Sequence, residues 1–246
     1  MSVTKRISAT SLLQVWERGQ LQAPVEKALT LLAAAYPDAT REELAMLSIG
    51  RRDASLLSLR EQLFGSQLSS LTACPACGEQ LELNFNVADI RAETPSLNKP
   101  LSVCESGYEL ELRLPTSLDL LRLVNCSTID EMRSQLFAQC VTRITHEGEA
   151  GSIEQVPNEI VDHAIARMGE ADPQADVEVD LNCPECRHVW QTGFDIVSYL
   201  WSEVHTWAGQ MLREVHLLAS GYGWSESDIL NMSAPRRRGY LEMLAG

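Results

Sequence analysis

The sequence predicts an α+β protein that is mostly helical and contains a small antiparallel sheet split by a helical insertion. Three observations lead to this prediction. Apolar residues recur at three- and four-residue spacing near both ends of the chain, which is typical of amphipathic helices. Shorter segments between them alternate apolar and polar residues, as half-buried strands do. Two Cys-Pro-x-Cys pairs, Cys74 with Cys77 and Cys183 with Cys186, flank the predicted insertion.

The composition indicates a folded protein whose partners are proteins. The 246 residues are 45% hydrophobic, which is enough for a sizeable core. A formal net charge of −14 disfavours binding to nucleic acid or anionic membranes, because phosphate contacts need clustered cations. The N-terminal segment has no apolar run of signal-peptide length. We therefore expect neither a nucleic-acid nor a membrane partner, and a location in the cytoplasm.

The N-terminal region, residues 1–66, is predicted to be helical. Pro24 suits the first turn of one helix, and Thr40 with Glu43 matches the capping box that begins another. A further helix over residues 52–64 should end at Gly65, because glycine commonly terminates helices. Packing of these helices on one another is the expected role of their apolar faces.

The middle of the chain combines strands with helices. Residues 81–87 and 108–114 alternate apolar and polar side chains, and we expect these two segments to pair in an antiparallel sheet. Capping patterns that begin at Thr116 and Thr128 predict a helical insertion. Residues 177–181 form another alternating strand, which runs directly into the second cysteine pair.

A long helix and two short ones are predicted to complete the chain. The long helix starts near Val197 and should end at Gly221, and Ser225 and Ser233 suit the starts of the two that follow. The predicted regions are 1–66, the N-terminal helical region; 67–115, the first half of the sheet; 116–174, the helical insertion; 175–196, the second half of the sheet; and 197–246, the C-terminal helical lobe.

The two cysteine pairs are the strongest indication of a functional site. A two-residue spacer lets both thiolates of a pair reach one ion, and two such turns supply the four sulfurs of a tetrahedral structural zinc site. We therefore predict one structural Zn²⁺ per chain, held by Cys74, Cys77, Cys183 and Cys186 in a zinc-ribbon-like sheet. The alternatives are unmetallated or redox-active thiols and an iron–sulfur site. His188 is a further candidate ligand, although a surface position in the turn is more typical.

Other side chains carry weaker predictions. The sequence contains no G-x-S-x-G, phosphate-binding glycine loop or H-E-x-x-H, so we predict that the protein is not an enzyme. Cys104, Cys126 and Cys140 have apolar neighbours and are expected to be buried structural thiols. Core packing and intramolecular ion pairs are the commoner fates of aromatic and arginine side chains. The candidates for partner contacts are nevertheless Trp224, Arg236, Arg237, Arg238 and Tyr240.

Several stretches of the chain resemble one protein family. Residues 213–230 and 236–244 are similar to T-even-type phage baseplate hub proteins and hub-assembly chaperones, including relatives in contractile injection systems. Residues 50–60 and 114–116 and both cysteine pairs add to the resemblance. It implies a role in building the baseplate of a contractile tail or injection device, with baseplate or tail proteins as partners. It implies no catalytic residue.

The sequence therefore predicts a non-enzymatic, zinc-stabilised assembly protein, a chaperone or component for the baseplate hub of a phage-like contractile tail or injection system. One alternative is a metal-dependent or thiol redox enzyme that uses the cysteine pairs, and another is a zinc-ribbon nucleic-acid adaptor. The expected location is the bacterial cytoplasm, or the host cytoplasm during phage assembly. A permanent component would be retained in the assembled particle.

Overall fold

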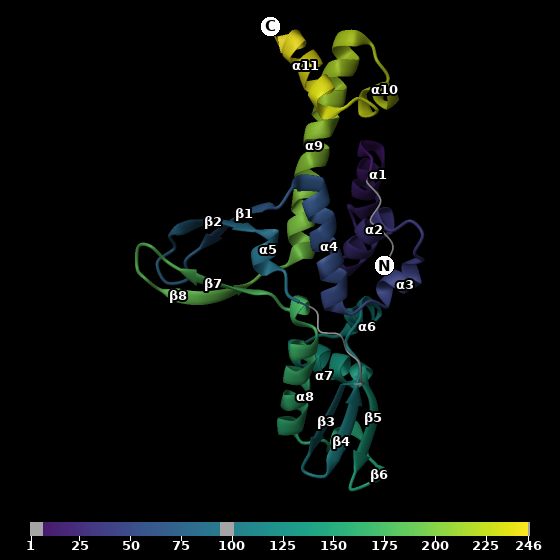
Figure 1. Ribbon diagram of the computed structural model, residues 1–246, viewed down its shortest axis with the longest axis vertical. Helices are drawn as coiled ribbons and strands as arrows, with labels where there is room; N and C mark the ends of the chain where they lie inside the picture. The colour runs from purple at the N-terminus through teal and green to yellow at the C-terminus, as the bar shows by residue number, and fades with distance from the viewer. Residues whose placement is uncertain (1–6, 94–100, 246) are drawn as a thin grey trace. The chain divides into compact units, whose positions relative to one another are not determined.

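A computed structural model describes residues 7–93 and 101–245 and shows an α+β protein, which confirms the predicted fold class (Figure 1). Helices account for most of the regular structure, and the strands form small antiparallel sheets. The chain divides into two compact units, one made of Met1–Ala39 with Ile196–Gly246 and the other of Thr40–Asp195. Within the described residues, no helix combines the length and the apolar character needed to cross a membrane.

The unit that contains both chain ends is built from helices arranged along α9. At 1.5 Å per residue, the 27 residues of α9 extend for about 40 Å. Each of the other helices in this unit contacts α9. Pro24 begins one of them and Ser225 caps another, as predicted. The described helices are α1 (Ala9–Gly19), α2 (Pro24–Ala35), α9 (Ile196–Tyr222), α10 (Glu226–Leu230) and α11 (Ala234–Ala245).

Close packing on α9 depends on its buried apolar stripe. Leu200, Val204 and Ala208 are fully buried at the three- and four-residue spacing that the sequence predicts. Gly19 allows α1 to approach α9, because a β-carbon at Gly19 would overlap the ring of Trp201. Near the far end of α9, a second group of buried side chains joins α1, α9 and α10: Leu13, Ala208, Met211, Val215, Leu218, Ile229 and Leu230.

The unit Thr40–Asp195 begins with two capped helices. Thr40 and Glu43 form the predicted capping box at the start of α3 (Arg41–Ala45). The longer α4 (Ile49–Phe64) ends at Gly65, whose φ of +90° suits glycine and few other residues. The buried Asp172 accepts a hydrogen bond of 2.8 Å from the backbone amide of Gly50 in the first turn of α4. A carboxylate at this position stabilises the helix start.

A four-stranded antiparallel sheet with the order β3-β4-β5-β6 forms one part of this unit. Its buried residues Leu101, Val103, Leu110 and Leu112 pack with apolar side chains of α7 and α8, so the sheet has its own core. The predicted caps of the first two helices are observed, because Thr116 and Thr128 begin α6 and α7. The elements are β3 (Leu101–Glu105), β4 (Tyr108–Leu112), α6 (Ser117–Arg122), α7 (Ile129–Cys140), β5 (Val141–His146), β6 (Glu149–Ala150) and α8 (Asn158–Ala171).

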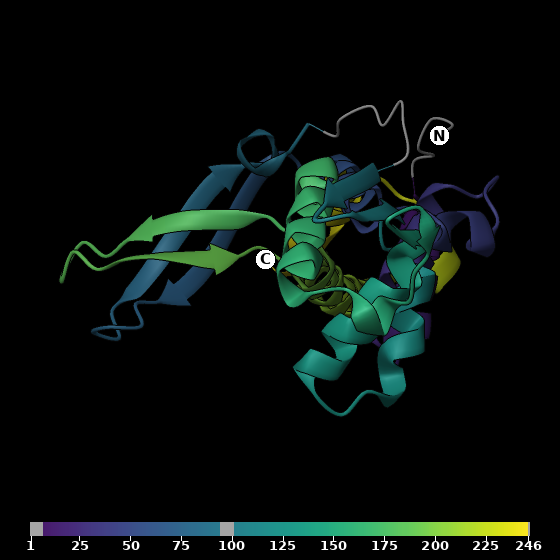
Figure 2. The same cartoon turned by 90° about the horizontal axis from the view of Figure 1, so that it is seen from below.

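Two separate β-hairpins complete the unit and lie side by side in both ribbon views (Figures 1 and 2). Each is a two-stranded antiparallel sheet. The short helix α5 follows the first hairpin, and its last residue, Ile90, accepts a hydrogen bond from the buried side chain of Gln174. The elements are β1 (Gln67–Ala73), β2 (Gln80–Asn86), α5 (Val87–Ile90), β7 (Glu178–Asn182) and β8 (Val189–Gly193).

The predicted pairing of residues 81–87 with 108–114 is wrong. The first segment belongs to β2, which pairs with β1, and the second belongs to β4, which pairs with β3 and β5. The segment predicted as a helical insertion also contains β5 and β6 beside its helices. Each alternating segment found a nearer partner in the chain, since antiparallel strands need only a short connection.

Candidate metal centre

Each cysteine pair occupies the turn of one hairpin, and the two turns have the same backbone hydrogen bonds. In the first, the Cys74 amide donates to the Glu79 carbonyl at 2.8 Å, and the Gly78 amide donates to the Cys74 carbonyl at 2.9 Å. In the second, the Cys183 amide donates to the His188 carbonyl at 2.9 Å, and the amide of the residue after Cys186 donates to the Cys183 carbonyl at 3.0 Å. The two cysteine turns therefore repeat one backbone structure.

The residue after each pair has a left-handed backbone. Gly78 has φ of +80° and Arg187 has φ of +60°, and both directly follow the second cysteine of their pair. A left-handed residue at this point helps the chain turn back into the second strand. Glycine adopts the conformation freely, whereas arginine does so at a modest conformational cost.

The two turns bring all four sulfurs together. The Sγ atoms of Cys74, Cys77, Cys183 and Cys186 lie within 4.8 Å of one another. Two of the distances cross between the hairpins: 3.7 Å from Cys74 to Cys186 and 3.6 Å from Cys77 to Cys183. Both are far longer than a disulfide bond of about 2.05 Å. They match the edge of about 3.8 Å that a tetrahedron has when each zinc–sulfur bond is about 2.3 Å.

Hydrogen bonds shift the pKa values of Cys74 and Cys77 in opposite directions. Burial opposes ionisation of Cys74, but hydrogen bonds from the backbone of Cys77 and Ala76 and from the thiols of Cys77 and Cys186 lower its pKa to about 7. The Glu79 backbone lowers the pKa of Cys77, yet its hydrogen bonds with the other cysteine side chains and its burial raise that pKa to about 12. A divalent cation would displace the remaining protons, because only deprotonated sulfurs act as ligands.

A small apolar cluster supports the sulfurs. Cys74 and Cys183 are 2% and 0% exposed, and Leu81, Leu83 and Trp190 pack with them. Nearer the bases of the hairpins, Phe85 and Phe194 meet edge to face with ring centroids 5.7 Å apart. This cluster has three buried residues and two partly buried ones, which is far smaller than the core of an independent domain. A bound metal would supply folding energy that so small a core lacks.

The cluster is closed by its four thiols. His188, the other candidate ligand, instead stacks on Trp190 with ring centroids 5.8 Å apart, and it does not belong to the group of potential ligand atoms. Four sulfurs fill a tetrahedral site and leave no position for water or substrate, which is the arrangement of structural metal sites. The residues present therefore fit a structural metal ion, and four tetrahedral thiolates are typical ligands of zinc and of iron–sulfur centres.

Comparison with known proteins identifies the family. A model of the family described as T4 bacteriophage base plate protein matches residues 8–201, which is most of the chain. The chain belongs to this family. A search of curated proteins and a search of solved structures found no match. Membership supports a structural or assembly role at a phage baseplate, with other baseplate proteins as partners.

The matched region of this baseplate protein contains both cysteine turns. It also contains residues 50–60 and 114–116, which carried part of the resemblance. Residues 213–230 and 236–244, which first suggested the family, lie beyond the match. The family assignment therefore rests on the helices and hairpins that precede residue 202, and the C-terminal lobe is interpreted from its own structure.

The three remaining cysteines differ from one another. Cys140 is fully buried, as expected, and burial raises the pKa of its thiol to about 11. Cys104 is exposed and Cys126 is partly exposed, so the prediction of burial is wrong for both of these cysteines. Cys104 alternates with the buried Val103 on β3, and neighbouring side chains of a strand point to opposite faces. The apolar neighbours of Cys104 in the sequence occupy the other face.

The candidate partner residues separate into packed and exposed groups. Trp224 stacks on Tyr222 with ring centroids 4.4 Å apart, and Tyr240 meets the edges of both rings. Arg237 is 6% exposed and donates 2.9 Å to Glu214 and 2.7 Å to the Met232 carbonyl.

The flanking arginines remain at the surface. Arg236 lies 5.7 Å from the Tyr240 ring centroid, and Arg238 is exposed. Trp224, Tyr240 and Arg237 therefore contribute to the fold of the lobe, whereas Arg236 and Arg238 are exposed.

Two polar side chains that position the hairpins were not predicted from the sequence. Gln174 is 3% exposed, accepts 2.8 Å from the Ala92 amide, and donates to the Ile90 carbonyl. Asp172, which caps α4, is 2% exposed. Both belong to the turn that precedes β7 and thereby tie the second hairpin to the helices that surround the first. The only sequence signal was a polar cluster beside Pro173, which resembles an ordinary loop.

Proposed function

We propose that this chain is a non-enzymatic, zinc-stabilised assembly protein for the baseplate hub of a phage-like contractile tail or injection system. Its match to the T4 base plate family over residues 8–201 is the observation that carries the proposal. In this proposal the chain acts as a hub chaperone or as a hub component, and works through protein contacts. Assembly takes place in the bacterial cytoplasm, where the chain is made.

Zinc has a structural role in this proposal. The ion joins two hairpins whose sequences are about a hundred residues apart, through Cys74, Cys77, Cys183 and Cys186. Each hairpin alone is a two-stranded sheet, a structure that is marginally stable at best in water. The closed set of four sulfurs supports a structural ion and disfavours the alternative of metal-dependent catalysis.

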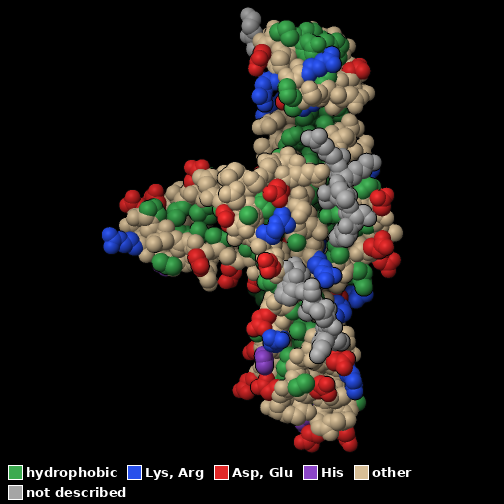
Figure 3. Space-filling model, in the orientation of Figure 1, with side chains coloured by type: hydrophobic (Ala, Val, Ile, Leu, Met, Phe, Trp, Pro, Cys, Tyr) green, Lys and Arg blue, Asp and Glu red, His purple; other side chains and the backbone are tan. Residues whose placement is uncertain are grey.

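Exposed apolar side chains support a role in protein contacts. Leu71 on β1 is 72% exposed and Val189 on β8 is 65% exposed. Figure 3 shows hydrophobic side chains gathered on the paired hairpins and on the helices of the C-terminal lobe. In the lobe, Leu217 and Met243 are 54% and 66% exposed. Apolar surface of this kind commonly marks contact sites for other proteins.

The proposal is tested by deleting the gene from a tail-producing strain and examining the particles. We expect tails that lack a properly assembled hub, and restoration by the wild-type gene but not by a Cys74→Ser, Cys183→Ser double variant. Mass spectrometry of purified wild-type tails then separates a retained component, which is present, from a chaperone, which is absent. Normal particles made without the gene would contradict the proposal.

A further inference from the structure

An open pocket of about 650 Å³ lies within the unit Thr40–Asp195. It is lined by the start of α4, by α6, and by the residues of β3 and β4 nearest to α6. Its volume is in the range of sites that bind small ligands or peptide side chains. The pocket is separate from the cysteine cluster and shares no residue with it. Its apolar walls are formed by Met46, Leu47, Leu101, Leu112, Leu114 and Leu118.

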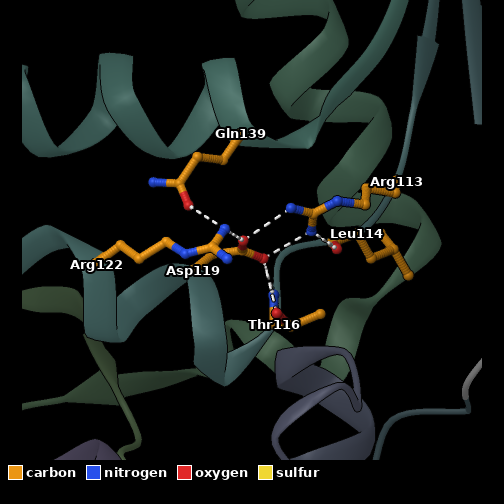
Figure 4. A network of polar contacts seen from close by, with 6 residues as sticks. All are labelled: Arg113, Leu114, Thr116, Asp119, Arg122 and Gln139. Carbon is orange, nitrogen blue, oxygen red and sulfur yellow. Dashed lines mark hydrogen bonds and ion pairs between the residues drawn. The ribbon is translucent and has the colours of Figure 1, made fainter.

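A fixed ion network forms the polar side of this pocket (Figure 4). Arg113 donates to both carboxylate oxygens of Asp119 at 2.6 and 2.8 Å. Thr116 donates to the same carboxylate from its amide and its hydroxyl, at 2.9 and 2.8 Å. The Asp119 side chain is 2% exposed, so these hydrogen bonds replace the water that it loses. Arg113 is therefore held in place and is already neutralised.

Two further arginines at the pocket are less neutralised by nearby carboxylates than Arg113 is. Arg122 lies 3.8 Å from Asp119 and is 66% exposed, and its one other polar contact within the described residues is 3.5 Å long, to Gln139. The exposed Arg51 side chain makes no hydrogen bond or ion pair with residues 7–93 or 101–245. Asp119 is the one carboxylate among the described lining residues, whereas Arg51, Arg113 and Arg122 are all cationic. The pocket consequently has an excess of positive charge.

This excess contrasts with the rest of the unit. Thr40–Asp195 carries the whole formal charge of −14, because acidic and basic residues balance in Met1–Ala39 with Ile196–Gly246. The cationic pocket attracts a short anionic group that binds within it. A long polyanion such as nucleic acid would also meet the acidic surface around the pocket and be repelled.

We infer that this pocket binds a peptide segment of a partner protein in which a carboxylate lies beside branched aliphatic side chains. Arg51 and Arg122 would bind the carboxylate through charge-assisted hydrogen bonds, and the leucine-lined wall would bury the aliphatic groups. Arg113 is a positioning residue, because its guanidinium holds Asp119 and the start of α6. The inference rests on the proposed assembly function, which makes the ligand a protein.

The test selects peptides from a random display library against the purified, metal-loaded full chain. Enriched peptides are synthesised, and their affinities are measured by fluorescence anisotropy for the wild type and for Arg51→Gln and Arg122→Gln. Arg143→Gln and Arg133→Gln are matched controls, since both arginines belong to the same unit and are 62% and 57% exposed. Inorganic phosphate serves as a competitor that has charge without aliphatic groups.

We expect the enriched peptides to combine Asp, Glu or a C-terminal carboxylate with Leu, Ile or Val. Each pocket variant should weaken binding roughly tenfold or more, and each control variant should change it less than about twofold. Replacement of the peptide carboxylate by an amide should have a similar effect to the pocket variants.

Enrichment of basic or uncharged peptides, or binding that Arg51→Gln and Arg122→Gln leave intact, would overturn the inference. Complete displacement of the peptide by inorganic phosphate at equal concentration would also overturn it, because the aliphatic wall would then contribute nothing. The selection does not depend on tail particles. A failed selection beside a hub defect in the deletion strain would therefore reject the pocket and leave the proposed function standing.

Discussion

Substitution of Asp119 by asparagine should remove a measurable part of the stability of Thr40–Asp195. The carboxylate accepts two hydrogen bonds from Arg113 and two from Thr116, and its side chain is 2% exposed. Asparagine has nearly the same shape but only one acceptor oxygen and no charge. The variant therefore removes the ion pair and leaves the cavity volume almost unchanged.

The pKa of Asp119 gives the expected size of the effect. Burial alone would raise this pKa, but the hydrogen bonds from Arg113 and Thr116 outweigh burial and lower it from 3.8 to about 2. The folded protein thus binds the proton more weakly than the unfolded chain does. The contribution is complete above the unfolded value and is lost as the pH falls from about 4 to about 2. At neutral pH it amounts to roughly 2 kcal/mol.

The assay is denaturant-induced unfolding of the wild type and Asp119→Asn, followed by circular dichroism at several pH values. We expect the variant to be less stable by roughly 2 kcal/mol near pH 7, and the difference to shrink as the pH approaches about 3. Asp162→Asn is a control whose carboxylate pairs with Arg133 at the surface and should cost less than about 1 kcal/mol. A difference that stays constant with pH would refute the assigned role of the charge.

The remaining predictions compare variants in pairs, with denaturant titration as the measurement. Gly50→Ala should lower the free energy of unfolding by roughly 1–3 kcal/mol, because the new β-carbon would overlap the Asp172 carboxylate that caps α4. Gly209 has open space around it, so Gly209→Ala should be neutral or stabilising by up to about 1 kcal/mol. Arg237→Ala should cost roughly 1–3 kcal/mol through loss of its buried hydrogen bonds, and Arg238→Ala less than about 0.5 kcal/mol. Equal effects within either pair would contradict the assigned packing.

Features that depend on neighbouring residues were predictable from the sequence. The capping box of Thr40 and Glu43, the end of α4 at Gly65, and the α2 start at Pro24 all follow from local backbone chemistry and are confirmed. The grouping of the four cysteines could also be predicted, because a two-residue spacer leaves little freedom in how a pair faces an ion. The separation of about a hundred residues between the two pairs does not affect that prediction, because each pair is a local turn.

Strand pairing was less predictable, because several of the actual partners have weak patterns. β1 has the sequence Gln-Leu-Ser-Ser-Leu-Thr-Ala and buries only Leu68 fully, so it lacks the apolar alternation that indicates a strand. β5 was not predicted because it begins at Val141, directly after the last residue of α7, in a region whose pattern predicts helices. Pairing is decided by side-chain packing between strands, which no single segment reveals.

Surface assignments depended on the direction in which each side chain points. The sequence does not distinguish Arg236, Arg237 and Arg238, but the side chains of consecutive residues on a helix point in directions about 100° apart. Arg237 consequently points into the lobe, where Glu214 and the Met232 carbonyl receive it, and its neighbours remain outside. The roles of Asp172 and Gln174 could not be predicted, because the backbone amides that they bind, of Gly50 and Ala92, lie far away in the sequence.

The most direct test of the account is elemental analysis of the purified full chain, repeated for Cys74→Ser, Cys183→Ser and the control Cys104→Ser. The account predicts about one zinc per chain in the wild type and in the control, whose exposed thiol lies outside the cluster. It predicts loss of the metal from both other variants, because each hairpin supplies half of one site. Zinc retained by Cys74→Ser or Cys183→Ser, or no metal in the wild type, would contradict a single shared site.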